Sequence, residues 1–104
     1  MCIRDSFETA VQREPELARA HDSLGLLAAV SGDPEGAARS WTRALQLSPD
    51  DPDALFNLGT LLWRQGRHGQ ARPYLERFLA VAPPARYADD LARVRAQLGV
   101  GAGR

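Results

Sequence analysis

Apolar and small side chains recur along the chain at the spacing of amphipathic helices, with short polar breaks between the runs. A first helix is predicted from about Glu16 to Val30, with Leu17, Leu24, Leu27 and Ala28 forming one buried face. Three more runs predict helices that start at residue 34, at residue 52 and near residue 71, and residues 85–98 predict a last one. The pattern therefore predicts an all-α protein.

The same residues return at a fixed interval. Pro15, Pro49 and Pro83 are each separated by 34 residues, and Leu24-Gly25 returns as Leu58-Gly59 at the same interval. An interval of this length is typical of repeated helix-turn-helix units, in which each unit buries its apolar face against the next. The chain is therefore predicted to be a solenoid of helical hairpins.

The breaks between the runs contain signals for helix ends. Gly32 can adopt the left-handed conformation that closes a helix, and Asp33 can cap the next helix, in which Pro34 takes the first position. Arg67 stands where the second repeat should have its capping aspartate, and Pro73 falls inside the helix that follows. We expect that helix either to start late, near Ala71, or to kink at the proline.

These repeated residues resemble the tetratricopeptide repeat family, whose pattern sets a large residue, Leu-Gly, a small residue, an aromatic, an alanine and a closing proline. The resemblance implies an all-α solenoid of about two and a half repeats with a C-terminal capping helix. Its parts are a single domain over 1–98, with a partial repeat at 1–17, repeats at 18–51 and 52–85 and the capping helix at 85–98, followed by a flexible tail at 99–104. The hexapeptide MCIRDS also resembles a translated adapter tail, which leaves open that residues 1–6 are foreign.

Composition narrows the classes of partner. The 104 residues have 13 basic and 13 acidic side chains, so no net field favours nucleic acid or an anionic membrane. No apolar run is long enough for membrane insertion, and the single Cys2 can form no internal disulfide, which leaves the compartment undetermined between cytoplasm and periplasm. Every basic residue is arginine, which suggests a genome rich in G and C and a bacterial origin.

The resemblance also implies a binding groove lined by the first helix of each repeat. Phe56, Trp63 and Arg64 are its strongest candidates for partner contact, because aromatic and arginine side chains dominate binding hot spots. The alternative is that Phe56 and Trp63 only pack against neighbouring helices, as we expect of Trp41. The implied groove positions are Arg19, Asp22, Leu26 and Ala29 in the first full repeat, and Asp53, Phe56, Thr60, Trp63 and Arg64 in the second.

Specific chemistry finds little support. The clamp with which some family members hold acidic C-termini is matched only by Asn57, and a carboxylate would meet Asp22 at one of its cationic positions. His21 and His68 lack further ligands at metal spacing, and no serine has an activating histidine. The acidic residues 50, 51 and 53 are better explained as helix caps than as a calcium loop. We expect no cofactor, no metal and no catalysis.

The predicted function is a non-catalytic scaffold that binds a peptide or protein partner in its concave groove. An alternative from another class is the C-terminal tail of a larger bacterial enzyme, such as a sulfatase-like hydrolase, with catalysis upstream. Because about three repeats are usually needed for stability, the open N-terminal end should expose Phe7, Val11 and nearby core residues. That end could be covered by upstream repeats or by a second copy of the chain in a homodimer.

Overall fold

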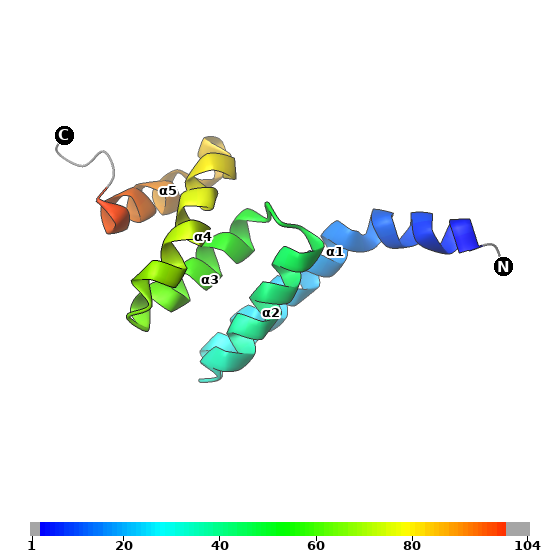
Figure 1. Ribbon diagram of the computed structural model, residues 1–104, viewed down its shortest axis with the longest axis horizontal. Helices are drawn as coiled ribbons and strands as arrows, with labels where there is room; N and C mark the ends of the chain where they lie inside the picture. The colour runs from blue at the N-terminus through cyan, green and yellow to red at the C-terminus, as the bar shows by residue number, and fades with distance from the viewer. Residues whose placement is uncertain (1–2, 100–104) are drawn as a thin grey trace. The chain divides into compact units, whose positions relative to one another are not determined.

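The computed structural model describes residues 3–99, with side chains described from residue 17 onward. Within this range it consists of five helices without a strand, so the predicted all-α fold class is confirmed. The chain forms two compact units, Met1–Asp51 and Pro52–Arg104. The helices are α1 (Ile3–Val30) and α2 (Pro34–Leu47) in the first unit, and α3 (Pro52–Arg64), α4 (His68–Val81) and α5 (Pro84–Leu98) in the second (Figure 1).

The first unit is a hairpin in which α1 packs against α2. Small residues line the contact, among them Ala18 and Gly25 on α1 and Ala37 on α2, all buried. Trp41 fills the space beside Gly25, where an added Cβ would lie 2.6 Å from the indole Cδ1. The indole N–H donates to the backbone carbonyl of Asp22 at 3.2 Å. Trp41 is therefore a core residue, as the sequence predicted.

The second unit repeats this construction. Gly59 on α3 faces Leu75 on α4, and an added Cβ would lie 2.6 Å from the leucine Cδ2. This pair stands 34 residues after Gly25 and Trp41, so a close glycine contact recurs at the same position of both hairpins. Phe78 of α4 is fully buried, and α5 packs against α4.

Both hairpin turns close their first helix in the same way. Gly32 has a φ of 83°, and the N–H of Asp33 donates to the carbonyl of Ala28 at 2.8 Å. Gly66 has a φ of 80°, and the N–H of Arg67 donates to the carbonyl of Leu62 at 2.9 Å. A left-handed glycine followed by this long backbone bond is the Schellman motif, which satisfies carbonyls at the helix end. The predicted role of Gly32 is confirmed.

The second helices of the two hairpins begin differently. The carboxylate of Asp33 accepts a hydrogen bond from the N–H of Gly36 at 3.0 Å, so Asp33 caps α2 as predicted. Arg67 occupies the same place before α4 and makes no side-chain cap bond. The first turn of α4 thus lacks the stabilisation that the first turn of α2 receives.

The predicted start of the first helix at Glu16 is wrong. α1 is continuous from Ile3 to Val30 and passes through Pro15. Its ribbon bends between the blue first part and the lighter blue second part (Figure 1). A proline inside a helix removes one backbone bond and bends the axis without having to end the helix. The division of the chain into repeats stays a prediction.

The predicted apolar face of α1 is also wrong. Leu17, Leu24 and Leu27 are 45%, 52% and 62% exposed and Ala28 is half-buried, while Ala18 and Gly25 are buried instead. The physical reason is the close approach of α1 and α2, because only small side chains fit between two backbones at that distance. The leucines follow the same helical spacing one position away and lie outside this contact.

Of the two outcomes predicted for the fourth helix, the late start is wrong, because α4 begins at His68 and contains Pro73. A kink at the proline stays a prediction. The proline can donate no bond to the carbonyl of Gly69, four residues earlier. Both residues are exposed, so water can take the missing donor's place. Helix α4 therefore tolerates a proline that a buried helix would not.

The last helix forms where the sequence predicts it and buries one apolar face. Tyr87, Leu91, Val94 and Leu98 are all buried on α5, which ends at Gly99 with a φ of 73°. The rest of the predicted tail, residues 100–104, lies outside the described residues. Among the described helices, none combines the length and apolarity that crossing a membrane requires.

Candidate functional site

The groove positions predicted on α3 share one side of that helix. Asp53, Phe56, Thr60 and Trp63 are half-buried, and Arg64 at the helix end is exposed. Their spacing of three and four residues places them along a single stripe of the helix surface. Helix α3 therefore presents two partly exposed aromatic rings and an exposed guanidinium along one line, while the Thr60 hydroxyl oxygen between them is buried.

Trp63 stacks on a residue that the sequence did not connect with it. Its ring lies 4.0 Å from the ring of His68, centroid to centroid, with 20° between the planes. His68 is the first residue of α4 and is exposed, as expected of a turn residue. The turn closed by Gly66 brings the end of α3 and the start of α4 together, so the two rings form a flat aromatic surface.

Phe56 has a stronger tie to the core. Its ring centroid lies 5.3 Å from that of Phe78, and Phe78 in turn meets Tyr87 edge-on at 5.7 Å. This chain of rings joins α3, α4 and α5. Part of the Phe56 side chain therefore packs against the core, and only the rest of its surface is open to a ligand.

Asp53 is held by a side chain from α5. The hydroxyl of Tyr87 donates to its Oδ1 at 2.9 Å, and the Arg86 guanidinium lies 5.4 Å from the Tyr87 ring centroid. Asp53 and Tyr87 are 34 residues apart and so occupy the same repeat position. Sequence reasoning missed this bond, although that shared position was a usable signal for it.

The groove positions of the first unit are less uniform. Arg19, Leu26 and Ala29 on α1 are exposed, with Leu26 at 51%. Asp22 is only 6% exposed and offers a partner almost no surface. The first unit therefore exposes fewer polar side chains at the predicted groove positions than the sequence indicated.

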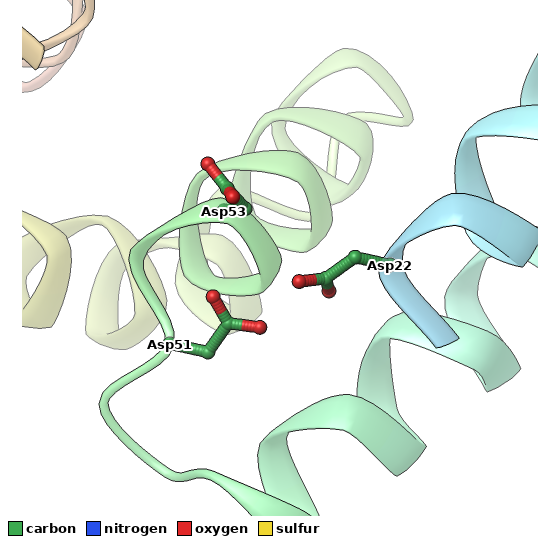
Figure 2. Close-up of side chains that lie close together, drawn as sticks. All are labelled: Asp22, Asp51 and Asp53. Atoms are coloured by element: carbon green, nitrogen blue, oxygen red, sulfur yellow. The ribbon is translucent and has the colours of Figure 1, made fainter. Parts of the chain in front are cut away.

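Asp51 and Asp53, which lie just before and at the start of α3, fit a local electrostatic role. Figure 2 labels Asp51 in the segment that leads into α3, Asp53 at the beginning of that helix and Asp22 on α1. Asp53 lies in the first turn of α3, where a negative charge interacts favourably with the positive end of the helix dipole. A side-chain capping bond from Asp51 stays a prediction.

Comparison with known protein families gives one consistent match. A model of the family described as tetratricopeptide repeat matches residues 4–52, 23–90 and 56–99. These overlapping matches span nearly the whole described part of the chain, including both hairpins and α5.

Three curated relatives show a similar pattern. The peroxisomal targeting signal receptor of Yarrowia lipolytica is 35% identical over 79 residues, covering 76% of this chain and 13% of the relative. A probable biofilm formation methyltransferase of Pseudomonas putida is 35% identical over 74 residues, 71% of this chain and 18% of the relative. Cellulose synthase operon protein C of Pseudomonas fluorescens is 41% identical over 56 residues, 54% of this chain and 4% of the relative. The chain thus spans less than a fifth of each relative's length.

Proposed function

Because the chain belongs to the tetratricopeptide repeat family, we propose that it is a non-catalytic scaffold that binds a peptide or protein partner along its first helices. Repeats of this family imply protein–protein interaction and are typically without catalytic activity. One relative is named as a receptor for a targeting signal, which is a protein-binding role for that protein. We place the binding surface on α3 and on the exposed groove positions of α1.

The observation that supports this surface is the state of Trp63 and Arg64. Trp63 is half-buried and stacks on an exposed histidine, while Arg64 beside it is exposed. A large ring that is held in place but not enclosed loses little conformational entropy when a partner covers it. Tryptophan and arginine are also the residue types that most often dominate binding energy.

Replacing Trp63 by alanine should weaken partner capture at least about tenfold, because a hot-spot ring is removed. Pull-down from a lysate followed by titration with the captured partner measures the loss, and circular dichroism should show nearly unchanged helicity. Trp63→Phe keeps an aromatic ring and should retain most of the capture. If the variant lost helicity to the same degree as it lost capture, Trp63 would be a core residue that stabilises the fold and not a residue that contacts the partner.

A second candidate function is supported by one of the relatives. The Pseudomonas putida protein is named a methyltransferase, and this chain matches only 18% of its length. By analogy, this chain is a repeat segment of a longer enzyme, and the catalytic part lies outside the matched residues. The relatives do not favour a sulfatase-like hydrolase over other classes of enzyme. Sequencing the gene upstream decides between a catalytic domain and further repeats.

The exposed leucines of α1 support a homodimer as a further partner arrangement. Leu17, Leu24 and Leu27 form an apolar stripe on one side of the helix, and a second copy could cover it. The side chains of Phe7 and Val11, which the sequence also predicted to be exposed, lie outside the described residues.

Introducing a charge into this stripe should prevent self-association. Leu24→Glu is expected to raise the dissociation constant of a dimer at least about tenfold, since a carboxylate would be buried without a partner. Light scattering over a dilution series measures the mass of both proteins. Thr42→Glu adds the same charge at an exposed position of α2 and should leave the mass unchanged. An unmodified chain that is monomeric at every concentration would contradict the dimer.

A further inference from the structure

The turn between α3 and α4 is strongly basic. Residues 63–72 contain Arg64, Arg67, His68 and Arg72 and no acidic residue, and these four side chains are all exposed. Arg72 makes only a long ion pair with Glu76, at 3.8 Å. The matching segment of the first hairpin, residues 29–38, contains two acidic residues and no basic one. The two turns have the same backbone motif and opposite charge, so the basic character is a property of the side chains and not of the turn.

Three local features favour a ligand that carries a negative charge next to an apolar or aromatic group. The Schellman turn at Gly66 leaves only two residues between Arg64 and Arg67, so the two guanidinium groups start from the same tight turn. The Trp63–His68 stack forms an aromatic surface beside them. Arg67 supplies no side-chain cap to α4, so the positive end of that helix dipole is not offset by an acid.

We propose that this α3–α4 turn surface, made by Trp63, Arg64, Arg67 and His68, docks an acidic segment of a protein partner. The inference rests on the proposed scaffold function and names the chemistry of the partner. Carboxylates of the segment pair with the two arginines, and an apolar or aromatic side chain next to them covers the indole. The charge along α3 sets the orientation: Asp53 lies at the start of the helix and Arg64 at its end, so the acidic end of the partner lies at the turn.

A protein segment fits the surface better than a nucleic acid does. Backbone recognition of nucleic acid uses a basic stripe that follows many phosphates. Here the cluster holds only three arginines and one histidine around one turn, and the chain as a whole has no net charge. Two arginines and one aromatic surface match a few carboxylates and one large side chain.

The variant Arg67→Asp separates binding from folding. It restores the capping residue that Asp33 supplies to α2, so the variant should be more stable than the unchanged protein, while the surface loses one positive charge and gains a negative one. The probe is a synthetic peptide of six glutamates and one large aromatic residue. A peptide of the same length, with lysines in place of the glutamates, is its control. We expect Arg67→Asp to bind the glutamate peptide about tenfold more weakly. Arg93→Asp makes the same change of charge at an exposed position of α5 and should bind it nearly normally.

Nuclear magnetic resonance provides a direct readout, because the chain has only two indole N–H groups. Titration with the glutamate peptide should shift the Trp63 indole signal and leave that of buried Trp41 in place. The assignment is overturned if the lysine peptide or an oligonucleotide of equal charge shifts Trp63 as strongly, or if Arg93→Asp loses as much affinity as Arg67→Asp. A captured partner that binds Arg67→Asp as well as the unchanged protein would overturn the turn surface and leave the scaffold function standing. Failure to capture any partner would count against the scaffold function, and the peptide titration would still decide on the surface.

Discussion

Replacing Phe78 by alanine should lower the free energy of unfolding by about 3–5 kcal/mol. Phe78 is fully buried and contacts a ring on each side, Phe56 on α3 and Tyr87 on α5. Its removal therefore leaves a cavity at the point where the three helices of the second unit meet. Because a small repeat domain has little stability in reserve, such a loss approaches its total.

Thermal and urea unfolding, followed by circular dichroism, measure this effect. The melting temperature should fall by more than about 12 °C for a domain of this size. Phe56→Ala is the matched control, since it removes the same ring from a half-buried position and should cost clearly less. Equal losses for the two variants would show that Phe78 is not the centre of this core.

Much of the backbone design could be predicted because it depends on local chemistry. A glycine that must adopt positive φ, as at Gly32, and an aspartate that caps the next helix, as at Asp33, act within one turn of chain. Trp41 could be placed in the core because the repeat pattern sets an aromatic there. These features need no knowledge of which helices meet.

The failures concern neighbours that the spacing does not specify. Leu24 and Leu27 follow a helical period that is compatible with burial, but the period does not say which element covers the stripe. The contact with α2 uses the small residues beside them. In the same way, Pro15 signals a disturbed helix and does not decide between a break and a bend.

The sequence could indicate which residues belong to the candidate surface, but not which of their side chains contact one another. Trp63 and Arg64 were named from the repeat position, but the stack on His68 depends on the path of the turn between two helices. The bond from Tyr87 to Asp53 depends on the approach of α5 to α3, which the 34-residue register alone could have suggested. Side-chain contacts across a turn or between repeats need the three-dimensional path of the backbone.

Gly25→Ala should be the most damaging addition of a single carbon to the chain, with a loss of about 2–3 kcal/mol in the free energy of unfolding. The new Cβ would lie 2.6 Å from two atoms of the Trp41 indole, closer than carbon atoms approach without repulsion. The indole is rigid, buried and fixed by its bond to the Asp22 carbonyl, so it cannot move away without losing that bond.

Alanine substitutions at two other glycines are controls for this prediction. Gly59→Ala meets Leu75, whose side chain can change rotamer, so its loss should be smaller, about 1–2 kcal/mol. Gly69→Ala has no atom within 4 Å of the new Cβ and should stabilise α4 by about 0.5 kcal/mol, since alanine favours the helix. Urea unfolding of the three variants gives the order directly. If Gly25→Ala were as harmless as Gly69→Ala, then α1 and α2 could not be as close as the indole contact requires, and the small residues between them would need another explanation.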